Sequence, residues 1–98
     1  MNVYPDYQVE SFRFCQAAFI LMDDVIKGKI PVPITLYGPF ELAMSSNNRL
    51  VLRDLDKPKN TRVIAHMYNK SNIRSDITRI GDMLASYLEA LQVKYEDN

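Results

Sequence analysis

The sequence predicts an α+β domain, in which a small antiparallel sheet is flanked by one helix at each end of the chain. Three observations lead to this prediction. A stretch with helical apolar spacing lies near each end of the chain, and the part between them is divided by prolines. Within that middle part, two runs of alternating residues are separated by a turn, as in a β-hairpin. A length of 98 residues fits a single globular domain over residues 1–98.

The first helix is expected over about residues 6–27. Asp6 can accept hydrogen bonds from the free backbone N–H groups of the first turn, and Gly28 and Pro31 end the helix. Two neighbouring rows of apolar side chains run along it, one made of Phe12, Cys15, Phe19, Met22 and Ile26 and the other of Phe14, Ala18, Leu21 and Val25. Because these rows leave only a narrow polar strip, the pattern predicts that most of this helix is buried in the core.

The stretch after the first helix contains Pro31, Pro33 and Pro39, which divide it into short extended pieces. Residues 34–37 are predicted to form a strand at the edge of the sheet. Residues 40–44 allow two interpretations. Their alternation of apolar and polar side chains is typical of a strand, whereas a proline followed by good helix formers is equally typical of one or two helical turns.

A central hairpin is expected from residues 49–55 and 61–68, joined by a turn at residues 56–60. Apolar residues point to both faces of these two strands. We therefore expect one face of the sheet to pack on the helices and the other to be half covered, by a loop, a partner or a ligand.

The last helix is expected over about residues 72–95, and it carries the strongest pattern in the sequence. Apolar residues step by four and three along one face, as they do in a coiled-coil seam: Ile73, Ile77, Ile80, Leu84, Tyr87 and Leu91. This face can pack on the chain's own sheet, or it can pair with a second copy of the helix. Since the first helix is apolar enough to fill a small core, we predict that these six residues form the interface of a homodimer.

The hairpin is also the basic part of the chain. The formal net charge is zero, but residues 48–70 carry six Lys or Arg against two Asp. Cationic side chains near an aromatic ring can contact phosphates and stack on bases, although arginines and lysines on an outward strand face are also ordinary solvated surface. The candidate binding residues on the hairpin and on the preceding turn are Arg49, Arg53, Lys57, Lys59, Arg62, His66, Tyr68, Tyr37 and Phe40.

Several classes of site lack a recognisable motif in the sequence. The single histidine, His66, is tied to no nucleophile or carboxylate by a known pattern, so no catalytic residue is predicted. One cysteine, Cys15, and one histidine cannot make a typical zinc site, and no glycine-rich phosphate loop is present, so we predict neither a metal nor a cofactor. A lone cysteine and the absence of a long apolar run favour a cytoplasmic protein that is not inserted in a membrane.

From these observations we predict a small non-enzymatic protein of regulatory, inhibitory or adaptor type. It is expected to form a homodimer and to bind another macromolecule, which we predict to be a protein. The alternative is a nucleic-acid or nucleotide binding module that uses the basic hairpin to hold phosphates.

Overall fold

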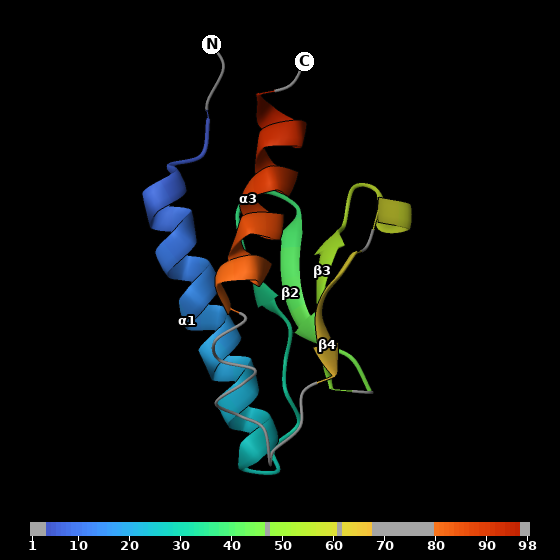
Figure 1. Ribbon diagram of the computed structural model, residues 1–98. Helices are drawn as coiled ribbons and strands as arrows, with labels where there is room; N and C mark the ends of the chain where they lie inside the picture. The colour runs from blue at the N-terminus through green and yellow to red at the C-terminus, as the bar shows by residue number, and fades with distance from the viewer. Residues whose placement is uncertain (1–3, 47, 61, 68–79, 97–98) are drawn as a thin grey trace.

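The computed structural model describes residues 4–46, 48–60, 62–67 and 80–96. In this part of the chain two helices pack on a four-stranded sheet (Figure 1). The elements follow one another as α1 (Tyr7–Ile26), β1 (Ile34–Thr35), β2 (Phe40–Met44), β3 (Arg49–Asp54), a short 3-10 turn η1 (Pro58–Asn60), β4 (Arg62–Met67) and α3 (Ile80–Tyr95). The predicted α+β class, with an N-terminal and a C-terminal helix, is confirmed.

Helix α1 begins and ends where its local residues require. The Asp6 carboxylate accepts hydrogen bonds from the backbone N–H groups of Gln8 at 3.0 Å and Val9 at 3.3 Å, which satisfies donors that have no partner inside the helix. After the last turn, Gly28 takes a φ of +72°, a left-handed conformation that glycine adopts without a steric penalty.

The sheet is antiparallel throughout and has the strand order β1-β2-β3-β4. Strand β1 lies at an edge, as predicted, and the central hairpin is present as β3 and β4. Residues 40–44 form a strand, which decides between the two interpretations of that segment. Its register pairs Phe40 with Asp54 and Leu42 with Leu52, so every second side chain of β2 points to the same face as the leucines of β3.

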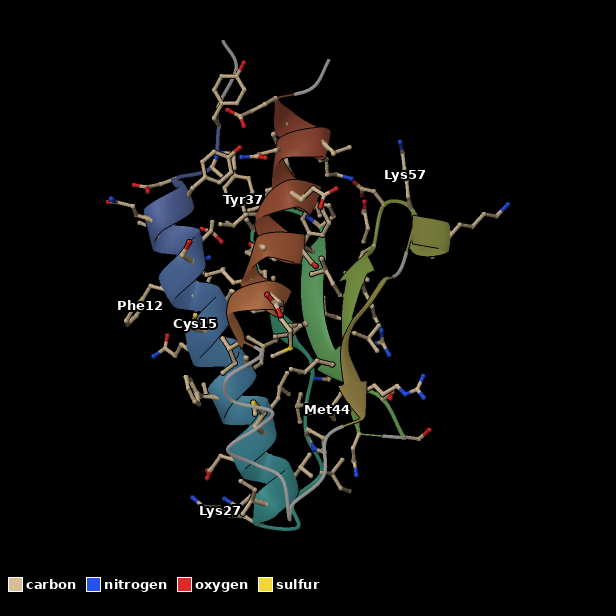
Figure 2. All side chains as sticks on the ribbon, in the orientation of Figure 1. Phe12, Cys15, Lys27, Tyr37, Met44 and Lys57 are labelled. Carbon is tan, nitrogen blue, oxygen red and sulfur yellow. The ribbon has the colours of Figure 1, made fainter. Side chains whose placement is uncertain are left out.

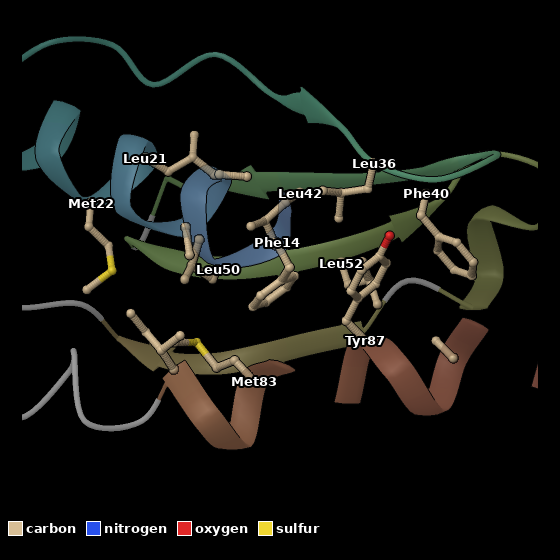
Figure 3. Close-up of a cluster of buried hydrophobic side chains, with 14 of the residues drawn as sticks. Phe14, Leu21, Met22, Leu36, Phe40, Leu42, Leu50, Leu52, Met83 and Tyr87 are labelled. Carbon is tan, nitrogen blue, oxygen red and sulfur yellow. The ribbon is translucent and has the colours of Figure 1, made fainter. Parts of the chain in front are cut away.

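Helices α1 and α3 run in opposite directions, lie side by side and pack on the sheet (Figure 1). The hydroxyl of Tyr7, at the start of α1, donates a hydrogen bond of 2.7 Å to the carboxylate of Glu96, just after the end of α3. The core lies between the helices and the sheet, and Figure 3 shows its central side chains, which include Phe14, Leu21, Met22, Leu36, Phe40, Leu42, Leu50, Leu52, Met83 and Tyr87.

The second face of the sheet also carries buried apolar residues. Ala43 and Val51 are register partners on β2 and β3, both are buried, and they alternate with the leucines that point to the helices. Glu41 and Arg53, the next partners along the same face, are half-buried. The pattern of apolar residues on both faces of β3 is therefore matched by burial on both faces.

The last helix was expected to start near residue 72. Residues 68–79 lie outside the described part of the chain, and α3 is described from Ile80 to Tyr95.

Candidate functional site

The described part of the predicted dimer seam on the last helix points into the chain's own core. Ile80, Tyr87 and Leu91 are buried among the core residues, and Leu84 is half-buried and packs against them. Ile73 and Ile77 lie outside the described residues. A dimer formed through Ile80, Tyr87 and Leu91 would first have to open the core. Of the two interpretations of this stripe, packing on the chain's own sheet is therefore the correct one for these three residues. A homodimer as such stays a prediction.

Tyr87 also organises the polar groups inside the core. Its hydroxyl donates to the Glu10 carboxylate at 2.9 Å and accepts from the Tyr37 backbone N–H at 3.2 Å. Glu10 is itself buried on α1. Burial raises the pKa of Tyr87, and the Glu10 carboxylate raises it further, so the hydroxyl stays protonated as the donor. Sequence reasoning missed this pair, since nothing in the local pattern around Glu10 reveals a partner 77 residues away.

The basic hairpin is less positive in the structure than in the sequence. Arg53 on β3 pairs with Glu41 on β2, with 3.3 Å between guanidinium nitrogen and carboxylate oxygen. Arg49 is exposed at the start of β3, and Lys57 and Lys59 are exposed on the turn. Of the remaining predicted residues, Arg62 and His66 belong to strand β4, and Tyr68 lies outside the described part of the chain.

A covered ion pair lies beside the hairpin. The Lys94 ammonium is 2.9 Å from a carboxylate oxygen of Asp54 and 3.8 Å from one of Asp56. Burial alone would raise the pKa of Asp54, but the hydrogen bond and charge of Lys94 hold it below its usual value. The same hydrogen bond raises the pKa of Lys94. One ammonium thus faces two carboxylates, so the cluster stabilises the junction of β3 and α3 and adds no positive charge that could attract an anion.

The turn at Tyr37 and Phe40 was predicted to help in binding a target. Phe40 is buried, with its ring centroid 6.1 Å from that of Tyr87 and 5.6 Å from the Lys94 ammonium. Tyr37 is half-buried and packs edge-on against Tyr95, with 5.2 Å between ring centroids. Phe40 therefore has no free surface to offer a partner, and this turn belongs to the packing of α3 on the sheet.

The most exposed apolar surface on a described helix is the side of α1 that faces away from the core. Five large apolar side chains on this side, which we call the outer face of α1, are between 40% and 71% exposed: Val9, Phe12, Phe19, Ile20 and Ile26. Figure 2 shows the Phe12 side chain pointing away from α3 and the sheet. With Cys15, Gln16 and Asp23, three of them line a shallow groove of about 510 Å³.

The outer face corrects the prediction for the first helix. Of the two apolar rows, the one with Phe14, Ala18, Leu21 and Val25 is buried as expected. In the other row Phe12, Phe19 and Ile26 are exposed. The reason is geometric, because the two rows lie on different sides of the helix and, among the described elements, α3 and β2 pack on the side that carries the Phe14 row. Sequence reasoning missed these residues as a site, although their separation from the Phe14 row was visible in the spacing.

Within the described ranges, no group of three or more His, Cys, Asp or Glu side chains could hold a metal ion. None of the helices in those ranges is long and apolar enough to cross a membrane.

Comparisons of the chain with protein-family models, with curated proteins and with solved structures gave no match. The residues and their geometry therefore supply the reasons for any function proposed for it.

Proposed function

We propose that this chain is a small non-enzymatic protein of regulatory, inhibitory or adaptor type, that it acts by binding another macromolecule, and that the outer face of α1 is where the macromolecule binds. One observation carries this proposal. Val9, Phe12, Phe19, Ile20 and Ile26 keep 40–71% of their surface exposed, and all five lie on one side of a single helix.

The size of this apolar surface is what distinguishes it from ordinary exposed residues. At their observed exposures, the five side chains present on the order of 500 Å² to water, given the usual areas of such residues. Scattered exposed apolar residues are normal on a soluble protein, whereas apolar surface of this size gathered on one side of a helix matches the largest patch of a typical monomer, which is often functional. Covering it releases ordered water, and that gain is available to any partner whose surface has the complementary shape.

The phosphate-binding alternative has weaker support. Arg53, the central cation of the predicted basic surface, has Glu41 as its partner at 3.3 Å, and Asp54 and Asp56 lie next to it in the chain and around Lys94. Binding to phosphate would have to displace the Glu41 carboxylate. We retain a cytoplasmic location as part of the proposal, on the ground of the single cysteine.

The proposal is tested by capture of partners from a native extract with three forms of the chain. These are the wild type, Phe12→Glu on the outer face, and Ile30→Glu as a matched control. Ile30 is 88% exposed and lies outside α1, so it receives the same charge at a site that the proposal does not use.

A purified partner identified in this way should bind the wild type and Ile30→Glu equally, and Phe12→Glu about 30-fold more weakly, as expected when an interface anchor is lost. If every captured protein binds all three forms with the same affinity, the outer face of α1 is not the binding surface and the proposal fails.

A further inference from the structure

We propose that the macromolecule on the outer face of α1 is a second copy of this chain, and that the two α1 helices pair in antiparallel orientation about a two-fold axis close to Gln16. This inference rests on the proposed function, because it names the partner of the same surface. It differs from a dimer built on the last helix, where Ile80, Tyr87 and Leu91 are buried and Leu84 is half-buried against the core.

The spacing along the outer face is that of a helix-pairing surface. Residues alternate in steps of three and four over the whole of α1, which is 20 residues long, in the series Val9, Phe12, Gln16, Phe19, Asp23 and Ile26. Such steps keep side chains on one narrow side of a helix, where they can pack into the gaps of a facing helix. Ile20 widens this surface beside Gln16. The outer face is therefore shaped to receive another helix along its length.

Gln16 lies at the middle of this surface, one polar residue between Phe12 and Phe19. A partner with only apolar atoms at this point would leave the amide unsatisfied, at a cost. A second copy removes the difficulty, because a side-chain amide has both a donor and an acceptor. Two Gln16 amides facing each other across a two-fold axis can donate to and accept from one another. The central polar residue thus favours a partner that carries the same residue.

The helix dipoles favour the antiparallel orientation. In a parallel pair the like ends of the two α1 dipoles would lie side by side, and the two Asp23 carboxylates, each 2.9 Å from the Lys27 ammonium of its own chain, would be neighbours in the seam. In an antiparallel pair centred on Gln16, each Asp23 lies beside Val9 of the other copy, because both are seven residues from the centre. There it lies near the positive end of the partner's helix dipole, which also carries the Asp6 carboxylate as its cap. Opposite ends of the two helix dipoles lie side by side only in the antiparallel arrangement, which is therefore the one we propose.

The area is also of the right size. A helix of 20 residues is about 30 Å long, and the apolar surface of about 500 Å² together with its polar rim approaches the roughly 800 Å² that each partner buries in a stable interface of standard size. Both copies contribute the same patch, as an isologous two-fold interface requires.

The first test measures the solution mass by sedimentation over a wide range of protein concentration. We expect the wild type and Ile30→Glu to form a dimer with the same dissociation constant. Phe12→Glu should weaken the dimer by about 30-fold or more, because it places a charge at the most exposed anchor of the outer face. Circular dichroism of each variant checks that the fold is retained, and Phe19→Glu provides a second, independent disruption of the same surface.

The native thiol supplies a position-specific readout. Cys15 is a free, half-buried cysteine and the only one in the chain, and it lies one residue from the proposed axis. A short bis-maleimide should therefore join two copies of the wild type through Cys15, and this product should be absent for Phe12→Glu and for Cys15→Ser.

The second test fixes the orientation, in a Cys15→Ser background. One form carries Val9→Cys and the other carries Asp23→Cys. In the antiparallel pair the mixture of the two forms should be cross-linked efficiently, whereas each form alone should not. A parallel pair gives the reverse result, with cross-links in each form alone and none added by mixing, and would overturn the proposed arrangement.

The outcomes separate this inference from the proposed function. A dimer that Phe12→Glu and Phe19→Glu leave intact overturns the inference. A chain that stays monomeric at all concentrations also overturns it, but leaves the proposed function standing if a different protein binds the wild type and not Phe12→Glu. A monomeric chain with no partner sensitive to Phe12→Glu overturns both.

Discussion

Both sides of α1 carry large apolar side chains, but their surroundings are opposite. Phe14, on the inner side, is fully buried and stacks on Tyr87 with 5.2 Å between ring centroids. Phe12 lies only two residues away on the same helix and is 71% exposed. A phenylalanine of α1 is thus part of the core at position 14 and exposed to solvent at position 12. Apolar spacing determines that a helix forms, but the number of elements packed around it determines which side is covered.

The largest expected effect comes from changing one phenylalanine at a time. Phe14→Ala should lower the free energy of unfolding by about 3–5 kcal/mol, because it removes a buried ring and leaves a cavity. Phe12→Ala should change it by less than about 0.5 kcal/mol in dilute solution, where the outer face is free. Urea unfolding followed by circular dichroism measures both values. Equal losses for the two variants would contradict the different surroundings of the two sides.

A smaller loss of stability is expected when the buried carboxylate of Glu10 loses its hydrogen-bond donor. Tyr87→Phe removes the hydroxyl that donates to Glu10 and accepts from the Tyr37 N–H, and leaves a buried carboxylate without this donor. We expect a loss of about 2 kcal/mol in unfolding free energy.

Tyr7→Phe is the matched control for this measurement, because it also removes a hydroxyl donor to a carboxylate, Glu96, but in an exposed hydrogen bond. Burial and this hydrogen bond raise the pKa of Tyr7 to about 12, so its hydroxyl is protonated throughout the neutral range. If Tyr7→Phe lowers the unfolding free energy as much as Tyr87→Phe does, burial adds nothing to the contribution of the hydrogen bond to Glu10.

The smallest effect on stability is expected for two ion pairs, each with 2.9 Å between the lysine nitrogen and a carboxylate oxygen. Lys94 and Asp54 are largely covered, whereas Lys27 and Asp23 are exposed beside the outer face. Lys94→Met should lower the unfolding free energy by about 1.5 kcal/mol at neutral pH. Lys27→Met should leave it unchanged within error, since exposed pairs contribute little.

The contribution of the covered pair has a definite pH window. The pKa of Asp54 is lowered on folding, so its stabilisation is present above the ordinary aspartate value, near pH 4, and is lost as the pH falls through the lower, folded value. The pKa of Lys94 is raised, so its contribution is present below the ordinary lysine value, near pH 10.4, and is lost above the raised one. The difference between wild type and Lys94→Met should therefore be constant from about pH 5 to 9 and shrink on both sides. A difference that does not change down to pH 2 would exclude this pair as its source.

The elements themselves could be predicted from local residues. Asp6 and Gly28 set the ends of α1, and the alternation in residues 49–54 set β3, because capping and strand alternation act over a few residues. Residues 40–44 stayed undecided because Pro39 and Glu41 fit a helix start as well as a strand. The pairing of Leu42 with Leu52 decides between them, and it is a contact across the sheet that no local pattern contains.

The candidate site was less predictable, for the same physical reason. The sequence pattern indicated that the stripe through Tyr87 and Leu91 was more apolar surface than the core could cover. In the structure the core covers both residues, and the exposed apolar surface lies on α1 instead. Which of two apolar helices is more fully covered depends on the packing of the whole molecule. Phe12 and Phe19 have the spacing of an exposed seam in the sequence, yet only the position of α1 on one side of α3 and β2 leaves them uncovered.

The most direct measurement of the central claim is hydroxyl-radical footprinting of the unmodified protein over a range of concentrations. The ratio of oxidation at Phe12 and Phe19 to oxidation at Ile30, whose side chain is exposed away from α1, reports how far the outer face is covered. We predict that this ratio is high in dilute solution and falls with rising concentration as a second copy covers α1. A ratio that stays high at every concentration, with Phe12 reacting as an isolated exposed side chain does, would contradict association through this face.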